Sequence, residues 1–368
     1  MRILATADWH IGVTHHGIDQ GDGRNSRSVD LEATLMQMVD IACEQHVDLF
    51  ICAGDIFHTN RPALEDQRVF WRVLSRLKKS RIPSRFIIGN HDYNSRLGAS
   101  HALKLFMDVI DGVSSGDDPS DSNIVIHDET KWEDFDDELS VCYFPYRGEE
   151  PDWSHGTGRQ KAVVCHSHLE GAVVGAEPFE IKDDNVTRFS SLPVDYVIAG
   201  HFHKPQVLSA KPLAFYPGSP QCVDFSERND CKGVVILDTD EGRQWSVPLN
   251  ARKFVQIDLE GVTTLDDANI PDVVGKVVKV NISVDEKQVK SFDEKGMREL
   301  LMSMGAHNVS SINLIVDRGS NVRDSMIKLD NSISKNFKRF IASKDYGDLT
   351  DDVVAKGLEI ISSCQPQS

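Results

Sequence analysis

The segment Phe86-Ile87-Ile88-Gly89-Asn90-His91-Asp92 decides the fold of this chain. Its three apolar residues are typical of a buried strand, and they lead into a glycine followed by three polar side chains. Glycine lets the backbone turn sharply and approach a ligand closely, whereas turn chemistry does not require His-Asp after Asn. The segment therefore predicts a strand that delivers an amide, an imidazole and a carboxylate to one place.

Four other short apolar runs end in a similar way. In an open α/β sheet the loops at the carboxyl ends of the strands line the ligand crevice, so these segments would bring their side chains together. The four are Ile3–Ala7, which leads into Asp8-Trp9-His10; Leu49–Ala53, into Gly54-Asp55-Ile56-Phe57-His58; Ala162–Cys165, into His166; and Tyr196–Ala199, into Gly200-His201-Phe202-His203.

The polar residues of these five clusters favour a metal site. Each cluster alone has an ordinary structural explanation, because a lone buried histidine is more often a core residue than a ligand. Together they supply two Asp, one Asn and several His side chains, a set that suits Mn²⁺, Fe²⁺ or Zn²⁺ better than Ca²⁺. Seven ligands are too many for one ion and fit two ions about 3.5–4 Å apart that share a carboxylate.

The strands alternate with amphipathic helical stretches up to about residue 250. Apolar residues recur at helical spacing in two segments, and such alternation implies a largely central sheet covered on both faces. The first segment carries Leu31, Leu35, Val39 and Ala42, and the second carries Val69, Val73 and Leu77.

The pattern changes near residue 250. We predict domains at 1–250, 251–319 and 320–368. The second is a small α/β unit, and the third holds two short helices that need a docking partner because neither could fold alone. The expected elements are strands at Phe254–Leu259, Val277–Val284 and Val309–Val316, a helix at Glu294–Met304, and tail helices marked by Ile333, Phe337 and Ile341 and by Val354, Leu358 and Ile361.

Composition excludes several classes of protein. The 368 residues carry 40 Lys and Arg against 57 Asp and Glu, a net charge of −17, which argues against binding to nucleic acid or membrane by bulk charge alone. No run of about 18 apolar residues and no signal peptide is present, so we expect a cytoplasmic protein with no membrane partner. The compact length and short tail suit a protein of a bacterial or phage-infected cell. Seven cysteines without a C-x-x-C motif suit a reducing compartment.

Charge is also unevenly distributed along the chain. Between Asp108 and Glu138 there are twelve acidic residues and one base, Lys131, most simply a solvated loop and alternatively a partner-binding tract. The segment from Lys328 to Lys344 is basic, with five Lys or Arg residues against Asp330.

The five clusters together resemble the phosphoesterase motifs of the calcineurin-like metallophosphoesterase superfamily. Further segments are similar to the SbcD-type nucleases of double-strand-break repair and their phage recombination-endonuclease relatives. The resemblance covers about residues 1–240 and implies a central β-sandwich flanked by helices, with a small α/β capping domain and C-terminal helices. The segments similar to the SbcD-type nucleases are Asp55 with His58, His166-Ser167-His168-Leu169-Glu170-Gly171, and Tyr216-Pro217-Gly218-Ser219-Pro220 followed by Val223-Asp224-Phe225.

The resemblance also implies a role for each site residue. Asp55 would bridge the two ions, His91 would protonate the leaving oxygen or stabilise the developing charge, and His58 would contact the scissile phosphate. The first ion would be held by Asp8, His10, Asp55 and His203, and the second by Asp55, Asn90, His166 and His201.

Several neighbouring residues have alternative interpretations. We prefer His166 to His168 as the ligand because it directly follows a strand, which leaves His168 to contact substrate or to pack. Asp92 would either orient an imidazole or cap a turn. Other candidates for DNA or phosphate contacts are His15, His16, Arg24, Arg27 and Arg61.

The function implied by the resemblance is a DNA nuclease with two divalent ions, Mn²⁺ by family likeness and Fe²⁺ or Zn²⁺ as alternatives. It would degrade duplex ends as an exonuclease and cut single strands as an endonuclease. The tail would bind an SbcC-like coiled-coil ATPase, and helices near 64–77 and 99–107 would form a homodimer. One alternative is a metallophosphatase or phosphodiesterase for small molecules or phosphoproteins. A non-catalytic scaffold is a third, which the complete set of ligand positions argues against.

Overall fold

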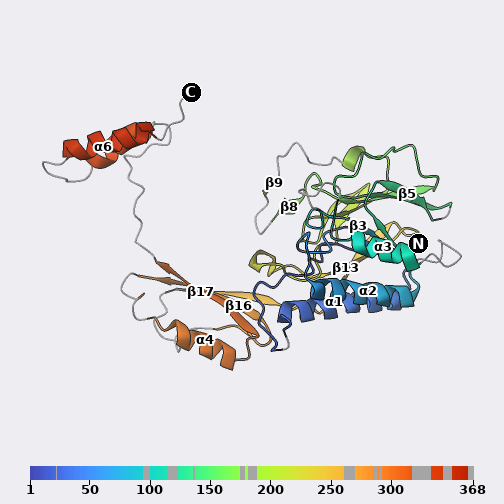
Figure 1. Cartoon of the computed structure of the whole chain (residues 1–368), viewed down its shortest axis with the longest axis horizontal. Coiled ribbons are helices and arrows are strands. Elements are labelled where there is room, and N and C mark those ends of the chain that lie inside the picture. Colours follow the sequence, from blue (N-terminus) through green and yellow to red (C-terminus); the bar gives the residue numbers. More distant parts are fainter. Residues whose placement is uncertain are drawn as a thin grey trace. The chain divides into compact units, whose positions relative to one another are not determined.

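The structure, a computed structural model, describes residues 1–21, 23–93, 100–113, 123–135, 137–174, 179–180, 189–260, 270–285, 289, 292–316, 333–342 and 350–363. The chain divides into two compact units (Figure 1). The first comprises Met1–Ile257, Ile270–Val280 and Lys295–Ile312, and the second comprises Asp258–Asn269, Asn281–Glu294 and Asn313–Ser368. The domain boundaries expected from the sequence stay a prediction.

The first unit contains a six-stranded sheet in the order β14-β13-β1-β2-β3-β4. Strands β1 to β4 are parallel to one another, whereas β13 runs antiparallel to both of its neighbours, β1 and β14. Because the parallel strands end at one edge, the loops that follow them share that edge. The bounds are Arg2–Thr6 (β1), Leu49–Cys52 (β2), Ser84–Ile87 (β3), Ile124–His127 (β4), Gly233–Asp238 (β13) and Arg243–Pro248 (β14).

A second six-stranded sheet has the order β11-β12-β10-β7-β6-β5. Its four central strands are parallel, and β5 and β11 run antiparallel at its two edges. The bounds are Lys131–Asp134 (β5), Leu139–Phe144 (β6), Gln160–His166 (β7), Tyr196–Gly200 (β10), Gln206–Ala210 (β11) and Leu213–Tyr216 (β12), with a separate small hairpin of Val173–Val174 (β8) and Phe179–Glu180 (β9).

The two sheets pack face to face around one apolar core. Ile51 of β2 and Val164 of β7 belong to the same buried cluster, and both side chains are 0% exposed. The β-sandwich implied by the family resemblance is confirmed, and the largely central sheet predicted from strand and helix alternation is covered on one face by a second sheet. The physical reason is that helical segments are scarce after β4, so the later strands cover the first sheet themselves.

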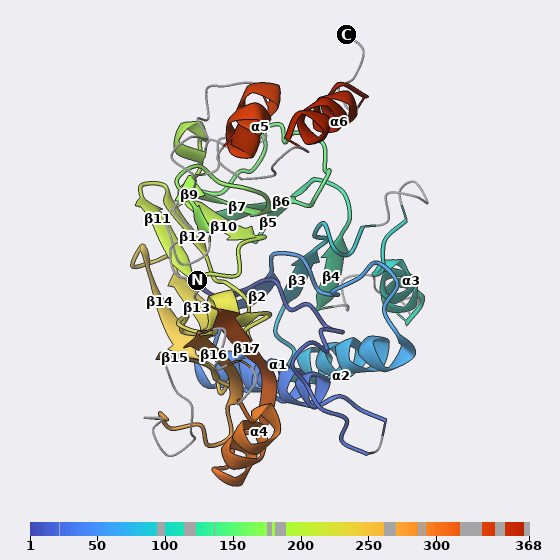
Figure 2. The same ribbon diagram turned by 90° about the vertical axis from the view of Figure 1, so that its left-hand side faces the viewer.

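Helices cover the outer face of the first sheet. Figure 2 shows α1 (Ser26–Glu44) and α2 (Leu64–Ser80) side by side, with α3 (Lys104–Val113) beside β4. Asn25 caps α1 by accepting a hydrogen bond from the Arg27 backbone N–H at 2.9 Å. The seven apolar residues predicted to face the core from α1 and α2 are all buried. The third helix begins at Lys104, later than the expected residue 99, which lies outside the described residues.

The C-terminal third follows the predicted order of elements. A three-stranded sheet has the order β15-β16-β17, and the tail forms two helices. Lys328, Lys344 and part of the acidic segment, residues 114–122 and 136, lie outside the described residues. The bounds are Phe254–Glu260 (β15), Val277–Val284 (β16), Glu294–Ser303 (α4), Asn308–Val316 (β17), Ile333–Ala342 (α5) and Thr350–Ser363 (α6). Earlier in the chain, short 3₁₀ turns lie at Phe189–Ser191 (η2) and Phe225–Glu227 (η3).

Candidate metal centre

Loops from both sheets converge at the carboxyl ends of the parallel strands. Asp8 follows β1 and Asp55 follows β2, and the two loops run together because the Asp8 N–H donates to Gly54 O at 3.0 Å. The second sheet joins them where the His201 N–H donates to the Asp8 carboxylate at 2.9 Å. Residues far apart in the sequence therefore meet at one edge of the sandwich.

Two glycines make this convergence possible. A Cβ on Gly89 would overlap the backbone N of Asp55, and a Cβ on Gly200 would overlap the carbonyl oxygen of Ala53. Neither obstacle is the flexible end of a side chain, so the backbone itself would have to move. These glycines therefore lie where the backbones of neighbouring loops approach each other closely, while the close approach to a ligand expected from the sequence stays a prediction.

One group of possible ligands contains Asp8, His10 and His203, whose ligand atoms lie within 4.8 Å of one another. Asp8 and His10 are buried. The Nε2 atoms of His10 and His203 face each other at 2.9 Å, and the Nδ1 atom of His10 is buried with no hydrogen-bond partner among the residues that the structure describes. Imidazole nitrogens in this arrangement are incompletely satisfied by the protein, which is the environment that a metal ion completes.

A second group contains Asp55, His166 and His201, with ligand atoms also within 4.8 Å of one another. The Oδ1 atom of Asn90 lies 2.9 Å from His166 Nε2 and 2.8 Å from His201 Nδ1, so the amide faces the same space. Asp55 Oδ2 lies 3.4 Å from His166 Nε2 and 3.7 Å from His10 Nε2. Asp55 thus lies between the two groups, where a bridging carboxylate would be needed.

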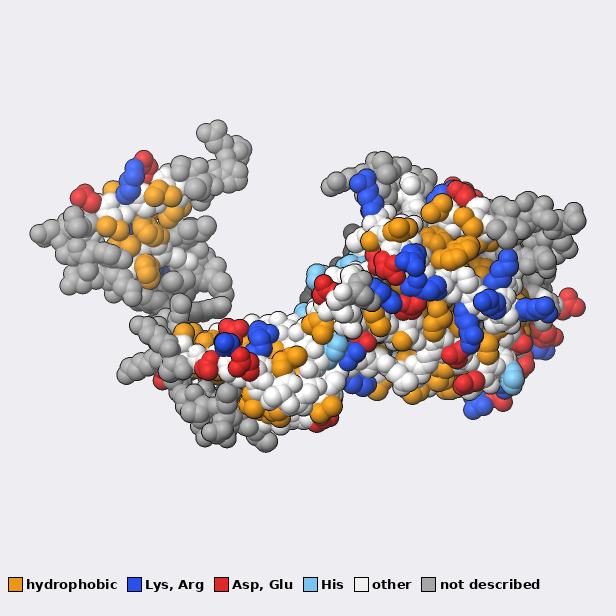
Figure 3. Space-filling view, turned by 60° about the horizontal axis from the view of Figure 1, so that its bottom comes forward, with side chains coloured by type: hydrophobic (Ala, Val, Ile, Leu, Met, Phe, Trp, Pro, Cys, Tyr) orange, Lys and Arg blue, Asp and Glu red, His pale blue; other side chains and the backbone are white. Residues whose placement is uncertain are grey.

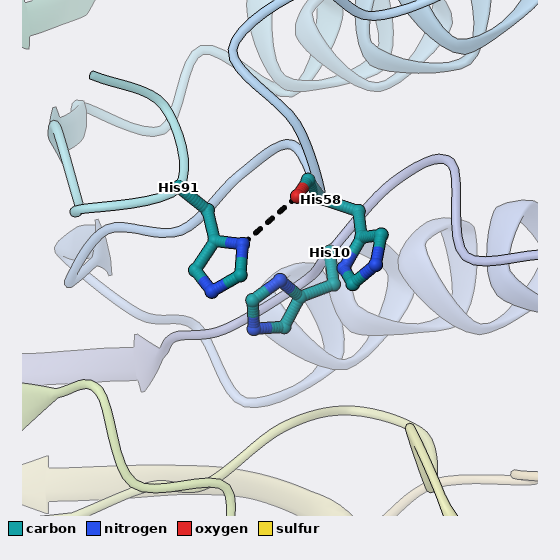
Figure 4. Close-up of side chains that lie close together, drawn as sticks. All are labelled: His10, His58 and His91. Carbon is teal, nitrogen blue, oxygen red and sulfur yellow. Dashed lines mark hydrogen bonds between the residues drawn. The ribbon is translucent and has the colours of Figure 1, made fainter. Parts of the chain in front are cut away.

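A third group of imidazoles, His10, His58 and His91, lies beside the first (Figure 4). The Nδ1 atom of His91 contacts the carbonyl oxygen of His58 at 2.8 Å, and its backbone N–H donates to Asp55 Oδ1 at 2.8 Å. The rings of His58 and His91 are stacked, with centroids 5.5 Å apart. With no carboxylate in this group, His58 and His91 are better suited to facing an anionic substrate than to holding a metal ion.

The pKa values of the two buried aspartates shift in opposite directions. Burial raises the pKa of Asp8 to about 6. Burial also acts to raise the pKa of Asp55, but the charge and hydrogen bond of His166, with His10 and His91 nearby, lower it well below its usual range. The same pairing outweighs burial at His166 and raises its pKa to about 9.

The pKa of His201 shifts in the opposite direction. Burial and the nearby His166 lower it to about 3, so this imidazole is neutral. With His166 also deprotonated, both imidazoles could offer a lone pair to a divalent cation. The donor set and its protonation therefore fit two divalent metal ions.

Partners behind the ligands hold several of them in place. His203 Nδ1 donates to Glu227 Oε1 at 2.8 Å, and His166 Nδ1 donates to Ala53 O at 2.8 Å. Glu227 also accepts hydrogen bonds from Lys232 Nζ at 2.6 Å and from Ser219 Oγ at 3.0 Å. These contacts fix the ring orientations, as is usual for histidines that bind metal.

Sequence reasoning missed Glu227 and Lys232. Lys232 is buried, with a side chain 2% exposed, and a buried lysine needs a carboxylate partner. The only sequence signal is that Glu227 closely follows the quoted segment ending at Phe225, while Lys232 stands just before the apolar run of β13. That pattern alone does not say that the pair would reach His203.

Asp92 caps the loops that follow β2 and β3, and none of its hydrogen bonds among the described residues goes to an imidazole ring. Its carboxylate accepts hydrogen bonds from the backbone N–H groups of Phe57 at 2.8 Å, Gly89 at 2.9 Å and Ile56 at 3.2 Å. The structure thus favours the turn-capping alternative for Asp92. The residue ties the loop after β2 to the loop after β3.

The remaining candidates occupy different environments. His168 contacts His201 through their Nε2 atoms and stacks on Phe202 with ring centroids 5.2 Å apart, so it lies next to the second group. His16 packs against Phe225, with centroids 5.0 Å apart, while His15 is exposed. The ring centroids of His15 and His58 lie 6.2 Å apart.

The three arginine candidates also differ. Arg27 is 3% exposed and donates to the carbonyl oxygen of Cys222, so the predicted phosphate contact by Arg27 is wrong: burial under the Phe254 ring removes it from solvent. Arg24 pairs with Glu32 at 2.6 Å. Arg61 is exposed.

Residues 1–205 match the family model of calcineurin-like phosphoesterases. The chain belongs to this family. The match covers more than half of the chain and includes every ligand candidate. Members of the calcineurin-like phosphoesterase family are metal-dependent phosphoesterases with a dinuclear centre, which is the role that the converging Asp and His groups can serve here.

Individual proteins are similar to this chain at modest sequence identity. The SbcD component of nuclease SbcCD from Bacillus subtilis (strain 168) is 31% identical over 276 residues, covering 66% of this chain and 68% of that protein. The DNA double-strand break repair protein Mre11 of Methanosarcina mazei is 25% identical over 374 residues, covering 96% of this chain but only 57% of that protein. The crystal structure of TT1561 of Thermus thermophilus is similar with a TM-score of 0.41 and 13% identity, covering 67% of this chain and 98% of that one. None of the helices in the described part of this calcineurin-like phosphoesterase is long and apolar enough to cross a membrane.

Proposed function

We propose that this protein is a DNA nuclease that uses two divalent metal ions, degrades duplex ends and cuts single strands. The observation that carries the proposal is the meeting of two ligand groups across Asp55, with His58 and His91 beside them. The SbcD and Mre11 nucleases among its homologues support DNA as the substrate. We favour Mn²⁺ because the oxygen and imidazole donors are hard to borderline, and Fe²⁺ or Zn²⁺ would also suit them.

The proposed residue roles follow from position. Asp8, His10 and His203 would hold one ion, Asn90, His166 and His201 the other, and Asp55 both. When bound, the ions supply positive charge and activate water for attack at phosphorus.

His91 would donate a proton to the leaving oxygen. Its Nδ1 atom contacts the His58 carbonyl oxygen, which fixes the ring and leaves Nε2 to face the site. His58, stacked on the His91 ring, would contact the scissile phosphate from the same side.

A cleavage assay separates this proposal from its alternative, a phosphatase or phosphodiesterase for small molecules or phosphoproteins. The purified chain with Mn²⁺ is given end-labelled linear duplex, circular single-stranded DNA and bis(p-nitrophenyl) phosphate. We expect nucleotide release from duplex ends, linearisation of the circle and slow turnover of the chromogenic diester. Turnover of the diester without cleavage of either DNA would overturn the nuclease assignment and favour the alternative.

We further propose that the tail helices bind an SbcC-like ATPase. Helices α5 and α6 pack together through Phe337 and Gly357, yet Phe340 is 37% and Ile360 is 55% exposed. In the view of Figure 3 hydrophobic side chains gather over this helix pair. Deleting residues 328–368 should abolish copurification with a coexpressed SbcC-like ATPase but leave Mn²⁺-dependent cleavage of single strands, and retained copurification would contradict the proposal.

A homodimer through α2 and α3 is the remaining part of the proposal. Trp71 of α2 is 45% and Leu105 of α3 is 57% exposed, and both line a shallow hollow of about 260 Å³ with Phe106 and Val109. Light scattering should show a dimer at micromolar concentration and a monomer after Leu105→Glu. A wild-type monomer would rule this arrangement out.

A further inference from the structure

Two tyrosines flank the loop that carries Asn90 and His91. Tyr93 follows His91 by two residues, and its carbonyl oxygen accepts a hydrogen bond from Asn60 Nδ2 at 3.3 Å. Tyr146 follows the end of β6 by two residues, and its backbone N–H donates to Ile88 O at 3.0 Å. Because β6 is parallel to β7, Tyr146 lies at the same edge of the sandwich as the ligand candidates.

An arginine covers both tyrosine rings. The guanidinium carbon of Arg147 lies 5.0 Å from the centroid of Tyr93 and 5.8 Å from that of Tyr146. The two rings meet edge to face, with centroids 6.1 Å apart. The rings are half-buried while Arg147 is exposed, so the cluster presents a flat cationic surface to solvent.

The backbone at Arg147 is itself unusual. Its φ of 61° lies in the left-handed region, which a non-glycine residue rarely adopts. The conformation turns the chain just after β6 and places the guanidinium over the rings. The hydroxyl groups of Tyr146 and Tyr93 beside the guanidinium raise the pKa of Arg147 further, so the group is a permanent cation at the rim of the site.

Nothing in the proposed chemistry uses this cluster. It contributes no ligand to either metal group and has no contact with His58 or His91 among the described interactions. Tyrosine rings and guanidinium planes are the surfaces on which unpaired bases stack, and such stacking tolerates any base. Although the chain has a net charge of −17, Arg147 places a positive charge at this edge of the sandwich.

We propose that Tyr93, Tyr146 and Arg147 form a stacking platform for an unpaired nucleobase next to the scissile phosphate. The inference rests on the proposed nuclease function and deepens it, because it identifies what would hold a single strand at the rim. The ordinary explanation, in which Arg147 merely closes the surface over two tyrosines, predicts no effect on nucleic acid.

The chain provides a matched control in Arg243. Its guanidinium carbon lies 5.3 Å from the centroid of Trp245 on edge strand β14, so Arg243→Ala removes the same kind of contact without altering the rim of the site. The test uses the full chain with Mn²⁺ and compares Arg147→Ala and Arg147→Lys with Arg243→Ala. The substrates are a single-stranded oligonucleotide and the same oligonucleotide with abasic sites flanking the cleaved bond.

We expect Arg147→Ala to raise KM for the oligonucleotide about tenfold, equivalent to about 1.4 kcal/mol, with kcat unchanged. Cleavage of the abasic strand, which has no base to stack, should be the same in all variants. Arg147→Lys should behave like Arg147→Ala, because a lysine keeps the charge but lacks the flat surface. Unchanged KM in Arg147→Ala would overturn the platform even if the wild-type protein cleaves DNA.

An abasic substrate distinguishes base stacking from a phosphate contact. With abasic sites flanking the cleaved bond, wild type and Arg147→Ala should share the same raised KM. A tenfold difference that persists on the abasic strand would assign Arg147 to the backbone and overturn the platform. Quenching of 2-aminopurine in the oligonucleotide measures binding directly, so the platform is tested even if cleavage fails and the nuclease function is wrong.

Discussion

Glu227 accepts a hydrogen bond from Nδ1 of His203, with 2.8 Å between Oε1 and the ring nitrogen. The other carboxylate oxygen of Glu227 lies 2.6 Å from Lys232 Nζ, and both side chains are buried. Burial alone would raise the pKa of Glu227, but the His203 hydrogen bond and the Lys232 charge lower it. The imidazole is thus held by a carboxylate that stays ionised.

Glu227→Gln should therefore weaken metal binding about 10- to 100-fold. The amide can still accept the hydrogen bond, but it cannot hold the ring with a charge. The variant also removes the nearer carboxylate from buried Lys232 and leaves Asp230 Oδ2, 3.4 Å away, as its ionic partner, so the free energy of unfolding should fall by at most about 3–5 kcal/mol. Titration calorimetry with Mn²⁺ and urea denaturation measure the two effects.

The double variant Glu227→Gln, Lys232→Met separates positioning from stability. Methionine removes the buried ammonium charge of Lys232 while filling similar space, so stability should largely return. Metal affinity should remain low, because the ring still lacks its carboxylate. Full recovery of both quantities would show that Glu227 acts only through the stability of the fold.

Gly200→Ala should abolish metal binding. The added Cβ would overlap the carbonyl oxygen of Ala53, which accepts the hydrogen bond from His166 Nδ1. Gly242→Ala is the control, since Gly242 has a φ of 62° but nothing within 4 Å of a Cβ. That control should cost only about 1 kcal/mol of backbone strain and keep the metal, and equal loss of metal in both variants would refute the steric explanation.

His91→Ala should retain two metal ions but lose about 10²- to 10⁴-fold in kcat for DNA, the usual contribution of a general acid. The His91 backbone N–H that donates to Asp55 is kept in alanine, so the bridge between the ligand groups should be preserved. Metal content by mass spectrometry and single-turnover cleavage would be compared with His155→Ala, an exposed histidine with a side chain 65% exposed. Normal turnover in His91→Ala would refute the assigned role.

His127 should make the protein less stable in mild acid. Burial lowers its pKa from 6.5 to about 4, so the unfolded chain takes up the proton first. The stability from this histidine is fully present above about pH 6.5 and is lost as the pH falls towards 4, by about 3 kcal/mol in all.

His127→Phe tests this directly. Phenylalanine keeps the stacking on Tyr143, whose ring centroid lies 4.2 Å from that of His127, but cannot titrate. The free energy of unfolding, measured by urea denaturation from pH 7 to 4.5, should fall less steeply than in the wild type. A parallel pH dependence in the two proteins would contradict the prediction.

Gly357→Val should separate α5 from α6. A Cβ on Gly357 already overlaps the Phe337 ring, and valine adds two further methyl groups at the same place. We expect lost binding of the SbcC-like ATPase with unchanged cleavage of single strands by the isolated chain. Ile360→Glu places a charge at a side chain that is 55% exposed, and retained partner binding in both variants would show that the helix pair is not the docking site.

Much of this architecture was predictable because short apolar runs and the residues at their ends are local signals. The five strands appear where the runs predicted them, and their polar ends meet in space. The division into two sheets was predicted only through the family resemblance, because a run such as Ala162–Cys165 does not by itself state which strand it pairs with. Glu227 was missed for the same reason, since its contact with His203 depends on a turn between β12 and β13 and on a lysine that only the fold brings near.

The first strand of the chain is completed by one of the last strands of its sheet. Arg2 of β1 pairs with Asp238 of β13, and the amino group of Met1 contacts Thr239 at 2.9 Å. At 5–20 residues per second, a ribosome needs roughly 10 to 50 seconds to make the chain between them. We therefore expect one side of β1 to stay unpaired until translation has passed β13. Until then the nascent chain should be a substrate for chaperones, and the metal centre should not form.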